Sequence, residues 1–158
     1  MSKLNNVVGI LCAVIVCTIG IISQQCNLSH QDRIRSAAES LYPTLVSFEF
    51  DGIEILESEK QILLYKHKVL NEHSSSLVRD EVATVSVDDV AIKNARLFKN
   101  IMNYCGGVFF AAAVTWNGEW SGICLYPCDP SLIPSQHISY CEDEHIYWLS
   151  KIPHTVIS

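Results

Sequence analysis

The chain has 158 residues, of which 49% are hydrophobic and 18% charged, and it carries a net charge of −6. This length holds one ordinary domain, and the composition excludes a basic nucleic-acid-binding module, a collagen-like chain and a multi-domain enzyme. Lys3 is the only charged residue before Asp32, so the body that follows is more acidic than the total indicates.

The first element along the chain is an apolar run over Val7–Ile22 with uncharged flanks. A helix of this length spans about 24 Å, and the flanks extend the part that can enter a hydrocarbon core about 30 Å thick. We therefore expect residues 1–26 to form a single-pass membrane anchor. A cleaved signal peptide is an alternative, although the small-residue positions fit a cleavage site poorly, and a lipidated or buried core helix is another.

The orientation of the anchor in the membrane is predicted less directly, because the numbers of positive residues on the two sides of the run are nearly equal. Lys3 precedes the run, and Arg33 and Arg35 follow it. The acidic body and its cysteines favour a position outside the cytoplasm, either periplasmic or extracellular. We expect residues 27–158 to form one domain there, anchored to the lipid bilayer, or secreted if the signal is cleaved.

The body opens with a helical pattern after Ser29 and Asp32, which resemble a capping box. Apolar residues recur at helical spacing at Ile34, Ala37, Ala38, Leu41 and Leu45. Pro43 disfavours helical backbone at the residue before it, so the helix is expected to end near Tyr42.

Alternating apolar residues then predict strands. The first covers residues 48–55 with a break at Asp51-Gly52, although this dipeptide is also suited to a tight hairpin turn. A polar turn over residues 57–60 leads to a second strand at Gln61–Leu70, and Leu77–Val85 can form a further short strand.

Ser86, Asp88 and Asp89 indicate the start of a second helix, because acidic side chains favour the positive end of the helix dipole. Gly106-Gly107 is expected to end this helix. Its predicted apolar face consists of Val87, Val90, Ala91, Ala95, Phe98, Ile101, Met102 and Cys105.

A hairpin follows, with strands at Val108–Trp116 and Glu119–Tyr126 joined by a two-residue Asn117-Gly118 turn. Three prolines then interrupt regular structure up to about Gln136 in a tail rich in Pro and Cys, and His137–Ser150 is a last strand or a short helix.

The element order therefore predicts an α+β fold. An N-terminal transmembrane helix precedes a small antiparallel sheet with two helices in α-β-β-α-β-β order, and a ferredoxin-like arrangement is one solution for that order.

Two of the seven cysteines lie in the apolar run, and five lie outside it. In an oxidising compartment we expect at least one disulfide among Cys124, Cys128 and Cys141, with Cys105 as a further candidate. Such a bond would fix the proline-rich tail, where few ladder hydrogen bonds are expected.

Zinc is the alternative for the same thiols. Cys124, Cys128, Cys141 and His145 have the spacing of a zinc knuckle, although two prolines interrupt the segment between them. This set belongs to the second functional hypothesis, a small secreted or anchored metal-binding domain or enzyme. The leading hypothesis includes no cofactor.

Two features are candidates for binding a partner. Trp116 and Trp120 flank the predicted hairpin turn, and Glu142, Asp143 and Glu144 form an acidic group. No catalytic signature is present, so no catalytic residue is assigned. The leading hypothesis is a non-enzymatic scaffold, assembly or recognition module that binds other envelope or membrane proteins, and no nucleic acid, outside the cytoplasm.

Overall fold

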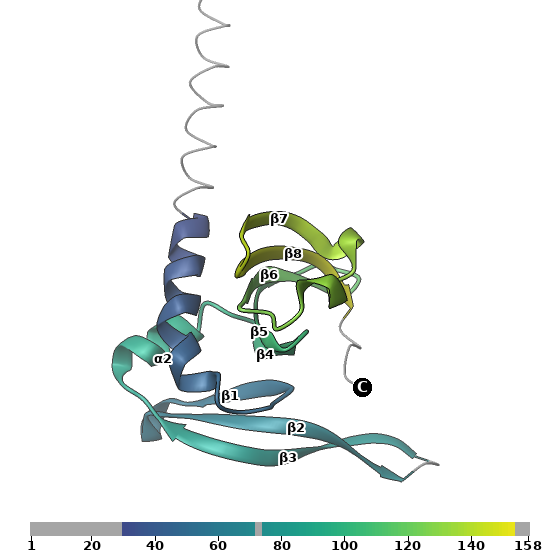
Figure 1. Ribbon diagram of the computed structural model, residues 1–158. Helices are drawn as coiled ribbons and strands as arrows, with labels where there is room; N and C mark the ends of the chain where they lie inside the picture. The colour runs from purple at the N-terminus through teal and green to yellow at the C-terminus, as the bar shows by residue number, and fades with distance from the viewer. Residues whose placement is uncertain (1–29, 72–73, 154–158) are drawn as a thin grey trace, which may run out of the picture. The chain divides into compact units, whose positions relative to one another are not determined.

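The computed structural model describes residues 30–71 and 74–153 (Figure 1). The chain divides into two units, Met1–Arg33 and Ile34–Ser158, and the fold below belongs to the second, apart from the start of the first helix at residues 30–33. The membrane anchor predicted over residues 1–26 lies outside the described residues. Within the two described ranges, no helix is both long enough and apolar enough to cross a bilayer.

The described residues confirm an α+β domain with two helices and eight antiparallel strands in two sheets. The strand orders are β1-β2-β3 and β4-β5-β6-β8-β7. The prediction of one sheet in α-β-β-α-β-β order, and with it the ferredoxin-like arrangement, is wrong, because three strands precede the second helix and five follow it. The strands are β1 (Gly52–Leu56), β2 (Gln61–Asn71), β3 (Ser74–Ser86), β4 (Asn100–Tyr104), β5 (Gly107–Val114), β6 (Glu119–Leu125), β7 (Ile138–Asp143) and β8 (Ile146–Pro153).

The first helix covers residues 30–45, and all five residues of its predicted apolar face are buried. The prediction that it ends near Tyr42 is wrong. The backbone N–H of Val46 still donates to the Tyr42 carbonyl at 2.9 Å. Burial of Leu45 in the core outweighs the one hydrogen bond that Pro43 cannot donate.

The three-stranded sheet contains the predicted strands in part: residues 48–50, expected to open the first strand, are not strand, and β1 begins at Gly52. The chain breaks before Gly52, as expected, and β1 pairs with β2 from Gly52 to Leu56, so the alternative of a hairpin turn at this dipeptide is wrong. A Cβ atom at Gly52 would collide with the Tyr65 ring unless that ring moved. The strand expected at Leu77–Val85 is confirmed and extends over the whole of β3.

The second helix, α2, covers only Asp89–Ala95 and begins at an Asp88 cap, whose side chain accepts from the Ala91 N–H at 2.7 Å. Its predicted extension to Cys105 is wrong, because β4 begins at Asn100. The apolar spacing in this stretch fits a strand as well as a helix. Pairing with β5, a contact between distant parts of the chain, selects the strand.

A two-residue turn joins β4 and β5 where the end of that helix was expected. Tyr104 pairs with Gly107, and the turn residues Cys105 and Gly106 have φ angles of 49° and 76°. Two consecutive positive φ angles are the signature of a type I′ turn. Cys105 therefore lies in a hairpin turn and not on the apolar face of a helix.

The first five residues of β5 are buried, and both faces of this strand are covered, which accounts for its unbroken apolar sequence. Val108 and Phe110 pack in one core cluster, together with the first helix and the three-stranded sheet. Phe109 and Ala111 pack in a second cluster on the opposite face. A strand that is buried on both faces is apolar at successive positions, because neither face contacts water.

Two asparagines of β4 join the sheets. The Asn103 N–H donates to the Phe50 carbonyl at 3.0 Å, and the Asn103 side-chain oxygen accepts the Phe50 N–H. Asn100 donates from Nδ2 to the Asp51 carbonyl at 3.2 Å and accepts the Ile53 N–H at 3.4 Å. Side-chain amides thus replace part of a backbone ladder between the sheets.

The proline-rich segment after β6 contains two 3₁₀ turns, Pro130–Leu132 and Ser135–His137, and it places Ile133 in the second core cluster. The last part of the chain forms the β7–β8 hairpin, so it supplies two strands in place of the single strand or helix that was expected.

Candidate functional site

The tip of the β5–β6 hairpin carries the most exposed large hydrophobic side chain of the described residues. Trp116 is 98% exposed. Gly118 donates to the Thr115 carbonyl at 3.0 Å and has a φ of 81°, and the Thr115 N–H donates to the Glu119 carbonyl at 2.8 Å. The loop therefore contains three residues, a type I turn followed by a left-handed glycine, and not the predicted two-residue turn.

Thr115 holds this turn in place. Its hydroxyl group accepts the Glu119 N–H at 3.1 Å and lies within hydrogen-bonding distance of the Asn117 side-chain oxygen and the Glu119 carbonyl. The indole of Trp116 is therefore presented to solvent from a backbone that is already ordered.

Trp120 has the opposite environment. It pairs with Val114 across the hairpin, is only 8% exposed, and packs in the second core cluster. The predicted aromatic pair is thus divided between surface and core, because Trp116 lies in the three-residue loop, whereas Trp120 lies on β6 and packs inward. Only Trp116 is available to a binding partner.

Much of the predicted acidic group is engaged within the chain. Glu142 forms an ion pair with Arg35 of the first helix, and Asp143 accepts the His145 N–H at 2.7 Å in the β7–β8 turn. Glu144 is exposed, and its carboxylate lies 3.4 Å from Nε2 of His145. The three carboxylates do not converge on one point.

The four residues of the predicted zinc set are not brought together. Cys124 is fully buried in the second core cluster, whereas Cys128 and Cys141 are exposed on separate loops and strands. The His145 ring stacks on Tyr126, with ring centroids 5.3 Å apart. Among the described residues, no three side chains of His, Cys, Asp or Glu are arranged to hold a metal ion.

The four cysteines in the described part of the chain are free thiols in this structure, so none of the predicted disulfides is formed. Burial raises the pKa of Cys124 to about 12, with a smaller contribution from Cys105 nearby. Burial also raises the pKa of the Cys105 thiol, which is half-buried in its turn. Cys128 and Cys141 are the accessible thiols.

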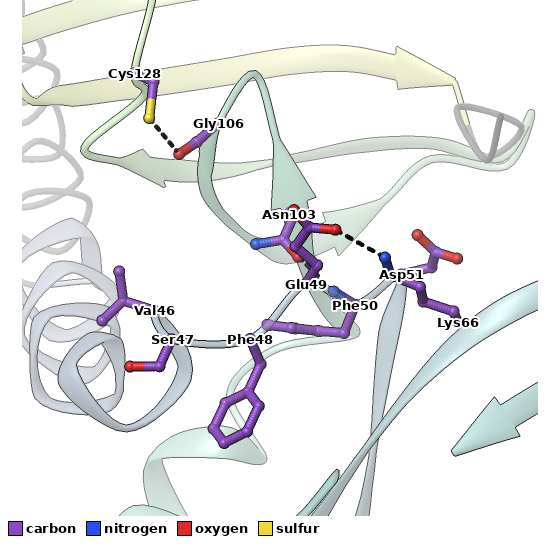
Figure 2. A pocket seen from close by; sticks show the side chains of 10 residues that line it. All are labelled: Val46, Ser47, Phe48, Glu49, Phe50, Asp51, Lys66, Asn103, Gly106 and Cys128. Carbon is purple, nitrogen blue, oxygen red and sulfur yellow. Dashed lines mark hydrogen bonds and ion pairs between the residues drawn. The ribbon is translucent and has the colours of Figure 1, made fainter. Parts of the chain in front are cut away.

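A pocket of about 580 Å³ that was not predicted from the sequence lies between the two sheets (Figure 2). Residues 46–51, which link the first helix to β1, form one wall, and Asn103, Gly106 and Cys128 line the opposite side. An ion pair of 2.9 Å between Lys66 and Glu49 lies at the pocket and lowers the pKa of Glu49. No sequence motif indicates this site, because its walls come from distant segments.

A row of aromatic rings was also missed. Tyr126 lies between Tyr42 and His145, with a centroid distance of 4.8 Å to the Tyr42 ring. Its φ angle is 51°, an unfavourable value for a bulky residue, and its N–H donates to the His145 carbonyl at 2.7 Å. These contacts fix the chain where it leaves β6.

Comparisons with protein-family models, with curated protein sequences and with solved structures give no match to this chain.

Proposed function

We propose that this protein is a membrane-anchored, non-enzymatic recognition module that binds another protein outside the cytoplasm through the tip of the β5–β6 hairpin. The observation that carries the proposal is the 98% exposure of Trp116. An indole group in water gains stabilisation when a partner covers it, and tryptophan is among the residues most enriched where binding energy is concentrated.

The backbone beneath Trp116 supports this proposal. Side chains that must be ordered on binding cost about 0.5–1.5 kcal/mol each, and a turn already held by hydrogen bonds avoids part of that cost. Residues 113–117 are all exposed and include no charged side chain. A partner therefore covers this tip without removing an ion from water, which is expensive.

The anchoring and the location rest on the sequence. The apolar run at Val7–Ile22 is suited to holding the chain in a bilayer, and the acidic body with its cysteines favours an extracytoplasmic side. An anchored module needs less intrinsic affinity for a membrane protein, because both are held at the same surface and their effective concentration is raised.

Site-specific photo-crosslinking in membranes tests the proposal. A photoreactive phenylalanine analogue replaces Trp116 in the full chain and, as a control, Leu132, which is 62% exposed on a different loop. We expect a discrete protein adduct from position 116 and none from position 132. Adducts with lipid alone, or equal adducts from both positions, would contradict a protein-binding tip.

A substitution then tests whether the indole supplies the affinity. The protein identified by crosslinking is then co-purified from membranes with the full chain, without the photoreactive analogue. Trp116→Ala should lower its recovery by more than about tenfold, the effect expected of a residue that dominates binding. Leu132→Ala should leave recovery unchanged. Recovery of the same protein at the same level from both variants would refute the proposal.

A further inference from the structure

Two cysteines that are distant in the sequence are adjacent at the base of the β5–β6 hairpin. The Cys128 N–H donates to the Cys105 carbonyl at 3.2 Å, and the Cys128 thiol donates to the Gly106 carbonyl at 3.1 Å (Figure 2). Standard bond lengths then limit the separation of the Cys105 and Cys128 Cα atoms to about 7 Å, and disulfides span up to about 6.8 Å.

Gly106 allows this close approach. A Cβ atom at Gly106 would lie 2.7 Å from the Cys128 Cβ and 2.9 Å from its sulfur. Such distances are shorter than a van der Waals contact, so only glycine lets Cys128 lie directly on the turn. The glycine that makes the type I′ turn therefore also brings Cys128 against the backbone of the turn that contains Cys105.

Cys124 is the competing partner for Cys105, because Cys105 packs against the core cluster that contains Cys124. Cys124 is fully buried, and its sulfur lies 3.9 Å from the Tyr104 carbonyl inside the core. Cys141 is on the β7–β8 hairpin, where its thiol contacts the Asp143 carbonyl at 3.0 Å. Cys128 is exposed and Cys105 is half-buried, so an oxidant in solution meets Cys128 first.

We propose that Cys105 and Cys128 form a disulfide by exchange with a small-molecule disulfide such as oxidised glutathione. The Cys128 thiolate attacks one glutathione sulfur, which forms a mixed disulfide and releases one glutathione thiolate that takes up the proton lost by Cys128. The Cys105 thiolate then attacks the Cys128 sulfur and displaces the second glutathione as a thiolate, which takes up the proton lost by Cys105. Two protein thiols are oxidised, and one glutathione disulfide is reduced to two thiols.

The bond would close a covalent ring that contains the whole of β5 and β6. It would fix the base of the hairpin and the side of the pocket formed by Gly106 and Cys128. This inference does not depend on the proposed function, because it concerns the two thiols and not what the hairpin tip binds.

Peptide mapping distinguishes the four described cysteines. No Lys or Arg lies between Lys99 and Lys151, so trypsin would leave all four on one peptide. Chymotrypsin cleaves after aromatic residues and leucine and separates them. The cuts that isolate each cysteine follow Tyr104, Phe109, Trp120, Leu125, Leu132, Tyr140 and Tyr147.

The reduced full chain is incubated with glutathione disulfide, alkylated to block the remaining thiols, digested with chymotrypsin and analysed by mass spectrometry. We expect Cys105 and Cys128 to lose alkylation together and to appear as one linked pair of peptides. Cys105→Ser and Cys128→Ser should each abolish this pair, whereas Cys141→Ser should leave it unchanged. The same reaction in denaturant should lose the preference for this pair.

Three outcomes would overturn the inference. Cys128 that remains bound to glutathione would show that Cys105 cannot reach it. A dominant link from Cys128 or Cys105 to Cys124 or Cys141 would assign the pairing differently. Full alkylation of Cys105 and Cys128 after oxidation would show that neither thiol reacts. Circular dichroism of the serine variants checks that a lost link does not result from unfolding.

Discussion

The two ends of strand β5 each carry a tight turn, but the turns differ in type and have opposite surroundings. At its start, the Cys105-Gly106 turn is covered by Cys128, and the sulfur of Cys128 contacts the turn backbone. At its end, the turn that carries Trp116 is stabilised by its own hydrogen bonds, and its indole is almost fully exposed. The contrast shows that a single hairpin is anchored at one end and presented to solvent at the other.

The largest expected effect separates the two tryptophans at the exposed end. Trp120→Ala should lower the free energy of unfolding by about 3–5 kcal/mol, because it removes a large buried side chain. Trp116→Ala should change it by less than about 0.5 kcal/mol, because the side chain is exposed. Urea unfolding followed by circular dichroism measures both. Similar losses in the two variants would mean that Trp116 also packs in the core.

The next effect compares the glycines of the two turns. Gly106→Ala should cost about 2–4 kcal/mol, since the new Cβ combines a left-handed backbone with a collision against Cys128. Gly118→Ala, at a φ of 81°, should cost about 1 kcal/mol of backbone strain. Thermal unfolding in reducing buffer ranks them. Equal losses of unfolding free energy in the two variants would indicate that Cys128 shifts away from the new Cβ atom without destabilising the fold.

Alkaline pH should lower the free energy of unfolding through Cys124, which pairs with Phe109 near the start of β5. The pKa of Cys124 is about 12 in the folded chain and about 9 when unfolded, so above pH 9 only the unfolded state loses this proton. The free energy of unfolding should then fall by up to about 1.4 kcal/mol per pH unit. Cys124→Ala should reduce this slope, measured by urea unfolding between pH 8 and 10.5 under reducing conditions.

Ile123→Val provides the control, because it alters the same buried strand without removing a titratable group, and its slope should match that of the unmodified chain. Tyr104, whose pKa burial raises to about 12, adds a loss of the same sign above pH 10 and should remain in both variants. A slope unaffected by Cys124→Ala would contradict a buried, protonated thiol at this position.

The smallest expected effect concerns the hydroxyl that orders the exposed turn. Thr115→Val removes the hydrogen bonds to Asn117 and Glu119 and should cost about 1 kcal/mol. Thr84→Val, which removes one exposed side-chain bond to Glu81, should cost less. Differential scanning calorimetry compares them. A larger loss at Thr84 would mean that the tip is ordered by other contacts.

Sequence patterns predicted the elements that local signals define. The buried face of the first helix, from Ile34 to Leu45, and the strands at Gln61–Asn71 and Gly107–Val114 follow directly from apolar periodicity. The Asp88 cap and the prolines after β6 also act through neighbouring residues, so they could be recognised without the rest of the chain.

The wrong predictions concern segments whose secondary structure is decided by contacts with distant parts of the chain. Ile101 and Met102 fit a helical face as well as a strand, and pairing with Phe110 and Phe109 made them β4. The same pairing moved Cys105 from a helix to a turn and created the second sheet. At the candidate site, the burial of Trp120 depended on which face of β6 packs against the core, and the exposure of Trp116 depended on its place in the loop. A turn signal specifies neither.

The junction between the sheets has a consequence for how the molecule opens. Each sheet has a continuous backbone ladder, whereas Asn100 and Asn103 join them largely through side-chain amides. When part of the protein transiently unfolds, we expect the junction to separate before either ladder does. The amide hydrogens of Phe50 and Ile53 should then exchange with solvent faster than those in the middle of β5, and their rates report how often the two sheets separate.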